Sequence, residues 1–456
     1  MLDTIAAIAT GGSISAIGIV RASGDGAVAA ADKVFKAACG TRLADAESRR
    51  MYYGELAGAD GGLIDICLCT ISRAPNSYTG EDTVEFHCHG SPVVLSEALR
   101  ALFSHGVRQA LAGEFTRRAF LNGRMDLTQA EAVIDLIEAE TPAAASNAAG
   151  QLRGAVSARL DSIYSALLDI MAHFHAVIDY PDEDIDEFEM RNHLSTLRDA
   201  ERELSLMLST SERGRVLREG VRTAIVGRPN TGKSSLLNAL VGYDRAIVNE
   251  SPGTTRDTIE EIIIVGGVAL RLIDTAGLRS ANDTVEMLGV ERARAALRGA
   301  SLAILVLDGA EALRNEDRDA LRSIPPGIPK IAAVNKSDLP LVLDDNELSA
   351  LGIGYCRVCA LTGDGFDALE SLIKKEFPKS GTPPTGEIIT NARQAEAISR
   401  ARTSVELAID AIEASVTPDA LLTDIEAALS SIGEITGKVI REDITLRIFD
   451  RFCVGK

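Results

Sequence analysis

Residues 227–234 read GRPNTGKS, and this stretch decides the fold of the middle of the chain. It follows the apolar segment 222–226 and precedes a helical sequence that opens at Ser235. Glycines let backbone N–H groups turn inward around phosphate oxygens, and the amino terminus of a helix adds partial positive charge. Lys233 can reach the β and γ phosphates, and Ser234 can ligate magnesium. The stretch therefore predicts a phosphate-binding P-loop.

The segments around the P-loop predict the rest of its module. Strand-like runs 222–226, 303–307 and 331–334 alternate with helical segments, which is the βαβ signature of a parallel sheet covered on both faces. Gly266 and Gly267 interrupt the alternation once and predict a hairpin. We expect an α/β module with a doubly covered sheet.

A second motif concerns the base of the nucleotide. Residues 335–338 read NKSD at the end of a strand-like run, and the Asp338 carboxylate can accept two N–H bonds from the edge of guanine. Adenine lacks that paired donor pattern. Hydrogen bonds to a charged group contribute roughly 1.5 to 3 kcal/mol each, so they discriminate strongly. An isolated tetrapeptide of this kind also suits an ordinary loop; behind a P-loop it indicates guanine.

Two stretches between these motifs, 253–257 (GTTRD) and 274–277 (DTAG), suit switch segments. The Thr255 hydroxyl can complete the magnesium shell, and Asp274 can hold the metal through water while the N–H of Gly277 senses the γ-phosphate. The residue after that glycine is leucine rather than glutamine. Another group must therefore position the attacking water.

The chain is predicted to have four segments, three of them outside the module. Residues 1–118 carry short β-rich runs with one or two helices, an α+β pattern. Residues 119–217 and 379–456 carry apolar residues at helical spacing. They flank the module at 218–378, and the last segment begins with a Pro/Gly/Thr-rich linker. If the two helical blocks pack as one bundle, the module is inserted into a helical host.

The net charge, the length of the apolar runs and the cysteine content indicate where the chain is located and what it binds. The 456 residues include 47 basic and 66 acidic ones, a net charge of −19, so the overall field repels nucleic acid and anionic membrane. An RNA contact then needs a local patch or a basic partner. No apolar run approaches the roughly 18 residues that span a bilayer, and no leader pattern opens the chain. With seven scattered cysteines, which suit a reducing compartment, we expect a cytoplasmic protein without a membrane segment.

The motifs together resemble the MnmE (TrmE) family of tRNA-modifying GTPases over essentially the whole chain. The stretches outside the module that carry the resemblance are 76–82 (NSYTGED), 113–116 (GEFT), 118–127 (RAFLNGRMDL) and 452–456 (FCVGK). The nucleotide motifs alone also admit ribosome-assembly GTPases of the Era and Der types.

The resemblance implies a multidomain α/β and α fold. Its parts would be an amino-terminal α+β folate-binding and dimerisation domain, a discontinuous helical bundle, and an inserted Ras-like P-loop GTPase domain. It also implies a homodimer that hydrolyses GTP and works with an FAD-containing MnmG-type partner in a heterotetramer or larger complex. The pair would add a carboxymethylaminomethyl or aminomethyl group at C5 of the wobble uridine of certain tRNAs, with 5-formyltetrahydrofolate as the one-carbon donor.

The residues expected to bind GTP or GDP come from the P-loop, the switch loops, the NKSD motif and a guanine loop in which Cys-Ala-Leu replaces the more usual Ser-Ala pattern. They are Asn230, Thr231, Gly232, Lys233, Ser234, Ser235, Asn249, Glu250, Ser251, Pro252, Gly253, Thr254, Thr255, Asp274, Thr275, Ala276, Gly277, Asn335, Lys336, Asp338, Cys359, Ala360 and Leu361.

The resemblance also assigns the cations and the catalytic groups. Ser234 and Thr255 would ligate magnesium. A potassium ion, which stabilises charge between the β and γ phosphates as an arginine finger does, would be held by Asn230, Asn249, Ser251 and Thr254. The expected catalytic residues are Lys233, Cys453 and the water-orienting Glu286. Glu286 also suits a solvated acid at the start of the 285–294 helix.

In the amino-terminal domain the resemblance assigns folate contacts to Arg21, Glu85, Arg124 and Lys456. Arg124 stands where lysine is frequent in the family, an exchange that keeps charge and changes geometry. Residues 10–15 read TGGSIS in place of a Pro-Pro-Gly-Arg-Gly-like loop.

Four further features have alternative interpretations. Glu85, His87 and His89 alternate on one strand and suit either a metal site or, as we favour, a cofactor pocket lined by imidazoles. The pair Cys356 and Cys359 has the C-x-x-C spacing but lacks a second ligand pair, and Cys359 lies in the guanine loop. We therefore expect no zinc or redox site there. Cys453 suits a chemical role or the positioning of the tail in the folate pocket. The acidic run 182–189 suits a solvated interhelical segment, as we favour, or the docking of a partner.

The alternative function is a regulatory ribosome-assembly GTPase that binds rRNA. It would carry an appended basic RNA module, whereas the carboxyl-terminal block here is helical and mixed in charge.

Overall fold

The computed structural model describes residues 3–179, 187–243, 261–273, 297–377, 386–414, 418–439, 448–449 and 452–455. The chain divides into two compact units. Unit 1 comprises Met1–Ile134, Gln151–Ala200 and Thr403–Lys456, and unit 2 comprises Asp135–Gly150 and Glu201–Arg402. The predicted domain boundaries near residues 118, 217 and 378 stay predictions, because the units divide the helical blocks at other positions.

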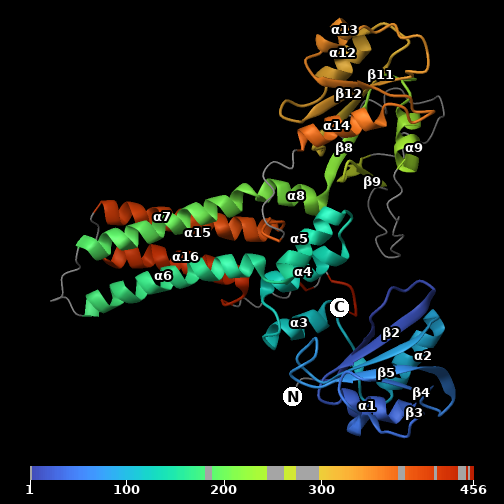
Figure 1. Ribbon diagram of the computed structural model, residues 1–456, viewed down its shortest axis with the longest axis vertical. Helices are drawn as coiled ribbons and strands as arrows, with labels where there is room; N and C mark the ends of the chain where they lie inside the picture. The colour runs from blue at the N-terminus through green and yellow to red at the C-terminus, as the bar shows by residue number, and fades with distance from the viewer. Residues whose placement is uncertain are drawn as a thin grey trace. The chain divides into compact units, whose positions relative to one another are not determined.

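Unit 1 begins with a seven-stranded sheet in the order β3-β4-β5-β6-β2-β1-β7 (Figure 1). Its strands are β1 (Ile5–Ile8), β2 (Ser15–Ser23), β3 (Phe35–Ala37), β4 (Met51–Ala57), β5 (Leu63–Ser72), β6 (Thr83–Gly90) and β7 (Arg108–Gln109). Helices α1 (Ala27–Val34) and α2 (Pro92–Phe103) lie with it, and a short 3-10 helix spans Leu43–Asp45. The α+β pattern predicted from the sequence is confirmed.

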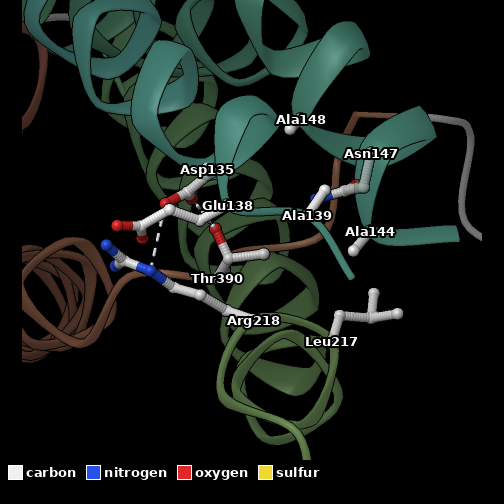
Figure 2. Close-up of a pocket in the computed structure, with 9 residues that line it drawn as sticks. All are labelled: Asp135, Glu138, Ala139, Ala144, Asn147, Ala148, Leu217, Arg218 and Thr390. Carbon is white, nitrogen blue, oxygen red and sulfur yellow. Dashed lines mark hydrogen bonds and ion pairs between the residues drawn. The ribbon is translucent and has the colours of Figure 1, made fainter. Parts of the chain in front are cut away.

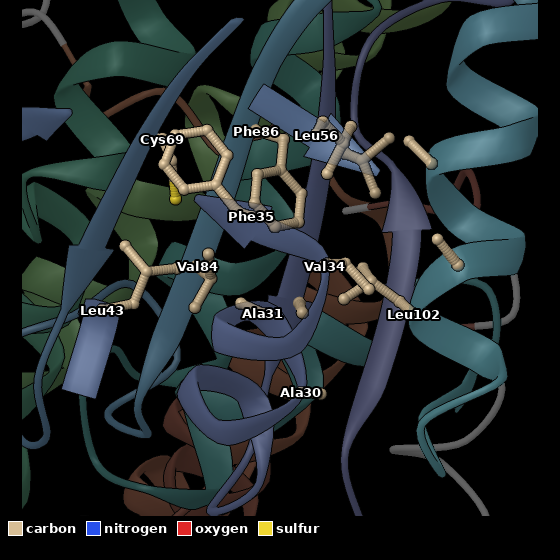
Figure 3. Packing of buried hydrophobic residues seen from close by; sticks show 14 of the residues in the cluster. Ala30, Ala31, Val34, Phe35, Leu43, Leu56, Cys69, Val84, Phe86 and Leu102 are labelled. Atoms are coloured by element: carbon tan, nitrogen blue, oxygen red, sulfur yellow. The ribbon is translucent and has the colours of Figure 1, made fainter. Parts of the chain in front are cut away.

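The core of this domain lies between the sheet and its two helices (Figure 3). Phe35 and Phe86 pack with ring centroids 5.8 Å apart, and Val34 and Leu102 bring the helices onto the same cluster. Alternate residues of the strands point to opposite faces, and those on the second face are more exposed. Exposed apolar side chains on that face are Ile17, Met51, Tyr53, Ile66 and Leu68.

The helices after the sheet follow the predicted helical pattern. They are α3 (Glu114–Leu121), α4 (Leu127–Ile137), α5 (Pro142–Leu152), α6 (Ala155–Asp179), α7 (Glu187–Ser209), α8 (Ser211–Glu219), α15 (Ala392–Glu413) and α16 (Pro418–Thr436). Within unit 1, α6 packs against α16, burying Leu167 and Phe174 on one side and Ile425 and Ile432 on the other. No helix of the described residues is long and apolar enough to cross a membrane.

Unit 2 holds a six-stranded sheet in the order β13-β12-β11-β8-β10-β9. The strands are β8 (Val221–Val226), β9 (Glu261–Val265), β10 (Val268–Leu272), β11 (Leu302–Asp308), β12 (Lys330–Asn335) and β13 (Gly354–Arg357), and the helices described with them are α9 (Lys233–Tyr243), α12 (Asn315–Arg322), α13 (Asp345–Ser349) and α14 (Phe366–Glu376). All neighbouring strands are parallel except β9 and β10.

This sheet confirms the predicted module. The three predicted strands are β8, β11 and β12, and the predicted hairpin turns at Gly266 and Gly267 between β9 and β10. Separate apolar clusters cover its two faces, as a parallel sheet requires. The helix after the P-loop begins at Lys233, two residues before the predicted start at Ser235, because Gly232 O already accepts the N–H of Leu236.

Candidate functional site

The P-loop leaves the carboxyl end of β8 and enters α9. A Cβ atom at Gly227 would lie 2.4 Å from the carbonyl oxygen of Val306 on the neighbouring strand, so only glycine allows this approach. Asn230, at the tip of the loop, has a φ of 63°, and Gly232 has a φ of 92°. A left-handed conformation at an asparagine costs free energy that the surrounding structure must offset. The loop is therefore held in one particular shape.

The Lys233 side chain folds back onto the P-loop. Its Nζ donates to the carbonyl oxygens of Gly227 at 2.9 Å and Arg228 at 2.6 Å. Burial lowers the pKa of the ammonium, and the nearby charge of Arg228 lowers it further. The Lys233 ammonium thus donates to two neutral carbonyl oxygens. Charged phosphate oxygens accept stronger hydrogen bonds from an ammonium and can replace these carbonyls.

Asn335 connects the P-loop with the predicted guanine loop. Its Nδ2 donates to Thr231 O at 3.0 Å, and its Oδ1 accepts the backbone N–H of Ala360 at 3.0 Å. The side chain is 2% exposed, so both hydrogen bonds are shielded from water. A Cβ atom at Gly232 would lie 2.2 Å from Asn335 Nδ2. Asn335 therefore fixes the spacing of two loops far apart in sequence.

Asp338 is exposed at the edge of this arrangement, and the Cys359 thiol donates to its Oδ1 across 3.2 Å. The backbone N–H of Ser337 donates to Val358 O at 3.2 Å, which holds the two loops side by side. Leu361 is 83% exposed. The carboxylate predicted to select guanine is thus oriented by the neighbouring loop.

Lys336 shows a contact that the sequence pattern did not indicate. Its Nζ lies 2.6 Å from Asp308 Oδ2, and Asp308 is only 3% exposed at the end of β11. Lys336 also has a left-handed φ of 63°. The Asp308 carboxylate therefore anchors the NKSD loop to the neighbouring strand.

The other predicted nucleotide residues divide into two groups. Ser234 and Ser235 lie in the first turn of α9, where both are exposed. The switch residues and the water-orienting group lie outside the described residues: Asn249, Glu250, Ser251, Pro252, Gly253, Thr254, Thr255, Asp274, Thr275, Ala276, Gly277 and Glu286.

In the amino-terminal sheet, Arg21 and Glu85 form a cross-strand pair. Arg21 Nε lies 2.7 Å from Glu85 Oε1, and the two residues face each other on β2 and β6. The Arg21 guanidinium lies 5.5 Å from the Tyr78 ring centroid and 5.7 Å from that of Phe115. His87 Nε2 lies 3.4 Å from the second Glu85 oxygen. Arg21 therefore lies between an acid and two aromatic rings, and His87 contacts the same acid.

The remaining predicted folate residues are described only in part. Arg124 is exposed, and its stem lies near Gly80, where a Cβ atom would meet Arg124 Cγ at 3.3 Å. Lys456 lies outside the described residues. Val454 forms an antiparallel bridge with Ala112.

The tail brings Cys453 to this domain. Gly113 N donates to Cys453 O at 3.4 Å, and the Cys453 side chain is exposed. Gly455 approaches so closely that a Cβ atom there would lie 2.2 Å from Ile8 O. The tail thus runs along the amino-terminal domain by its backbone, and the thiol has no side-chain partner among the described residues.

A buried charge network explains why the NSYTGED, GEFT and RAFLNGRMDL stretches carry charges. Arg118, 3% exposed, pairs with Glu81 at 3.1 Å and Glu114 at 2.9 Å, each 9% exposed. Asp3 adds a third carboxylate at 3.0 Å. The sequence pattern does not indicate this network, because it joins residues distant in sequence.

Unit 2 also has a small pocket, shown in Figure 2, where the chain enters and leaves the P-loop module. Asp135 accepts the Thr390 hydroxyl at 3.0 Å and lies 3.0 Å from Arg218 Nε. Asn147 accepts the backbone N–H groups of Gly386 at 3.2 Å and Ile388 at 3.3 Å. Residues of α4 and α5 therefore bind both connecting segments of the module.

A parallel sheet whose strand β8 passes through a glycine-rich loop into α9 defines a P-loop nucleotide-binding protein. The profile described as "MnmE helical domain" matches residues 127–453, and that described as "GTP-binding protein TrmE N-terminus" matches residues 4–124. The tRNA modification GTPase MnmE of Heliobacterium modesticaldum is 44% identical over 100% of this chain and 99% of that protein. This chain belongs to the MnmE (TrmE) family.

Two further relatives also align with this chain over nearly their full lengths. The tRNA modification GTPase MnmE of Symbiobacterium thermophilum is 43% identical over 100% of this chain and 99% of its own length, and that of Thermoanaerobacter pseudethanolicus is 41% identical over 100% of both. Among solved structures, the G domain of the T. maritima FeoB iron transporter aligns with 34% of this chain and 96% of its own at 30% identity, with a TM-score of 0.26. The family resemblance inferred from the sequence is confirmed by the full-length relatives.

Proposed function

We propose that this chain binds GTP at the P-loop and hydrolyses it to GDP and phosphate. The observation that carries the proposal is the double hydrogen bond of Asn335, which fixes the phosphate-binding loop relative to the guanine loop. With that spacing fixed, a ligand must match both a phosphate group and a base edge. Asp338, oriented by Cys359, then accepts the paired N–H donors of guanine, which adenine lacks.

The proposed roles within the P-loop follow from its donors. The backbone amides and Lys233 would bind the phosphates. Ser234 and Asn230 are exposed and carry the oxygen ligands that hard cations prefer, so they fit magnesium and potassium. Thr255 would complete the magnesium set, and Asn249, Ser251 and Thr254 the potassium set. These cations would neutralise charge on the phosphates, and Glu286 would orient water.

Nucleotide binding gives the direct test. Purified protein is titrated with fluorescent GDP and ADP, and GDP should bind at least about a hundredfold more tightly, as polar readout of a base permits. Lys233→Ala should remove most of the affinity. Equal binding of ADP and GDP would reject guanine selectivity. Turnover in potassium and in sodium then tests the cation, because equal rates contradict a potassium requirement.

We further propose that GTP hydrolysis serves modification of the wobble uridine of tRNA at C5 in the cytoplasm, with an FAD-dependent MnmG-type partner and 5-formyltetrahydrofolate. The relatives are named tRNA modification GTPases over their full lengths. Arg21, Glu85, Arg124 and Lys456 would hold the folate. The aromatic and charged groups around Arg21 fit a flat heterocycle with hydrogen-bonding edges.

The folate proposal has its own test. Glu85→Gln and Arg21→Met should each weaken binding of 5-formyltetrahydrofolate to the purified chain about tenfold or more, because a charged hydrogen bond is lost. GDP binding should stay unchanged in both. Unchanged folate affinity in both variants would show that the pocket lies elsewhere.

A homodimer is proposed from the second face of the amino-terminal sheet. Tyr53, Ile17 and Met51 are exposed there by 60%, 60% and 46%, and contiguous exposed apolar surface marks interaction sites. Tyr53→Glu should convert a dimer to a monomer in light scattering. Tyr355→Glu, in the P-loop module, is the control that should leave the dimer intact.

The biological role is tested by mass spectrometry of wobble uridines from cells that lack the protein. Loss of the C5 substituent, with restoration by the wild-type chain, is the expected result. Unchanged uridines combined with a ribosome-assembly defect would favour the alternative, a regulatory GTPase that binds rRNA.

A further inference from the structure

Arg228, the second residue of the P-loop, pairs with two acids outside that loop. Its Nη2 lies 2.8 Å from Glu311 Oε2, and its Nε lies 3.2 Å from Asp317 Oδ1. The Arg228 and Asp317 side chains are 8% and 4% exposed, whereas Glu311 is 41% exposed. The Arg228–Asp317 pair is therefore buried, and the Arg228–Glu311 pair is open to water.

Asp317 is itself fixed by a helix. It lies in the first turn of α12, and its Oδ2 accepts the backbone N–H of Arg314 at 3.0 Å. A carboxylate in the first turn also interacts favourably with the partial positive charge of the helix. Asp317 thus connects the P-loop to a regular element, whose position does not depend on the loop.

The backbone of Arg228 is tied to two other residues of the P-loop. Its carbonyl oxygen accepts Lys233 Nζ at 2.6 Å and Thr231 Oγ1 at 3.1 Å. Two residues further along, Asn230 holds a left-handed φ of 63°, which persists only when the surroundings determine it. A shift of Arg228 would therefore move Lys233 and relax the tip of the loop together.

We propose that Asp317 is a positioning residue for phosphate binding: through its buried ion pair with Arg228 it holds the P-loop in the conformation that receives the nucleotide's phosphates. The proposal rests on the proposed function, the binding of GTP and GDP at this loop. Asp317 contacts neither base nor phosphate in this scheme. Removal of Asp317 takes the buried partner from the Arg228 guanidinium and leaves Glu311, which is open to water and compensates the charge less, whereas loss of the exposed partner has little effect.

The test compares Asp317→Asn with Glu311→Gln, a matched control at the exposed partner of the same guanidinium. Asparagine keeps an oxygen that can accept the Arg314 N–H, so the start of α12 is retained. Full-length protein is titrated with GDP and, by competition, with guanosine, which lacks phosphate. Asp317→Asn should weaken GDP binding about tenfold or more and leave guanosine binding within about twofold. Glu311→Gln should change both by less than about threefold.

A second comparison isolates the pair. In the Arg228→Met background, Asp317→Asn should cause no further loss of GDP affinity, because its partner is already absent. A loss that adds in full would overturn the proposal. So would Asp317→Asn binding GDP like the wild type, or losing GDP and guanosine affinity equally, which indicates general unfolding. Wild-type protein that binds guanosine but not GDP would reject the proposed function itself.

Discussion

The thiol of Cys359 donates a hydrogen bond to the carboxylate of Asp338 across 3.2 Å. Cys359 is 1% exposed, whereas Asp338 is exposed at the predicted base-binding edge. The buried residue therefore orients the exposed carboxylate that we propose selects guanine.

Cys359→Ala should weaken GDP binding about three- to tenfold, the effect of losing one hydrogen bond that is worth about 1 kcal/mol. Cys359→Ser supplies a hydroxyl donor and should bind GDP within about twofold of the wild type. Both affinities can be measured with fluorescent GDP, with ADP as the selectivity control. Equal affinities of the alanine variant and the wild type would show that the thiol does not orient Asp338.

Lys233 should link GDP binding to proton uptake at alkaline pH. Burial and the charge of Arg228 lower its pKa below the ordinary 10.5, and phosphate should raise it again. In the window between the lowered pKa and 10.5, free protein has partly lost the proton that the complex retains, so GDP affinity falls as pH rises through that window. The unfolded chain also retains this proton, so the nucleotide-free protein gains stability from Lys233 as pH rises there.

Calorimetry in two buffers with different ionisation enthalpies measures the proton uptake. Lys233→Arg keeps its charge throughout the window and serves as the control, with no uptake expected from this position. Wild-type protein whose binding enthalpy is the same in both buffers throughout that window would contradict the linkage.

The sequence predicted the elements whose signals are local. The strand, glycine-rich loop and helix around 227–234 are contiguous, and the hairpin at Gly266 is specified by its own turn residues. The contacts that fix the site are not local. Asn335 lies 104 residues from Thr231, and Arg228 lies 89 residues from Asp317. No spacing or periodicity relates such pairs, so a single sequence could indicate the motifs but not what holds them together.

The amino-terminal site shows the same limit. The resemblance supplied Arg21 and Glu85 as ligands, and the structure adds that they pair with each other. Tyr78 belongs to the 76–82 stretch, whose sequence does not indicate a contact with Arg21. Its ring contacts Arg21 only because the chain folds back. Predictions for the switch residues, Glu286 and Lys456 fall outside the described residues and stay predictions.

Asn147→Ala should lower the free energy of unfolding of unit 2, because Asn147 binds the segment that follows the P-loop module. The Asn147 side chain, 4% exposed, bonds the N–H groups of Gly386 and Ile388 and the carbonyl of Ile388. Truncation leaves buried backbone groups unsatisfied, at a cost of about 2–4 kcal/mol. Urea unfolding followed by circular dichroism measures it. Asn346→Ala, on an exposed face of α13, should cost less than about 0.5 kcal/mol; equal losses would contradict the assigned role.

Thiol labelling should separate the cysteines by burial. Cys39 and Cys453 are exposed, whereas Cys67, Cys69 and Cys356 are buried. Hydrogen bonding to Thr41 lowers the pKa of Cys39, and burial raises the pKa of Cys356 to about 12. Native protein treated with a maleimide at neutral pH should therefore react first at the two exposed positions, since the thiolate is the nucleophile.

Mass spectrometry of the labelled peptides identifies the sites. Cys39→Ser should leave Cys453 as the fast-reacting position, and urea should expose the buried thiols to the reagent. Labelling of Cys356 as fast as Cys453 under native conditions would contradict the burial argument.

Arg118→Met should lower the free energy of unfolding of unit 1 more than the loss of an exposed ion pair does. It removes the guanidinium that pairs with Glu81 and one of the two that pair with Glu114, both acids 9% exposed; Arg108 stays with Glu114. A buried carboxylate that loses its partner costs about 3–5 kcal/mol. Arg100→Met is the control, because the Arg100–Glu97 pair is exposed and contributes about 0.2–1 kcal/mol. Urea unfolding at pH 7 measures both, and similar losses would show that the network is not buried in solution.

The same network predicts acid sensitivity. Burial raises the pKa of Glu114, but hydrogen bonds from Arg108, the Leu111 backbone and Arg118 outweigh it and leave the pKa below its ordinary 4.5. The resulting stability is fully present above pH 4.5 and is lost as pH falls through the lowered pKa, because the unfolded chain binds the proton first. In Arg118→Met part of that lowering disappears, so stability should change less between pH 5 and 3 than in the wild type. An unchanged pH dependence would mean that Arg118 does not act on Glu114.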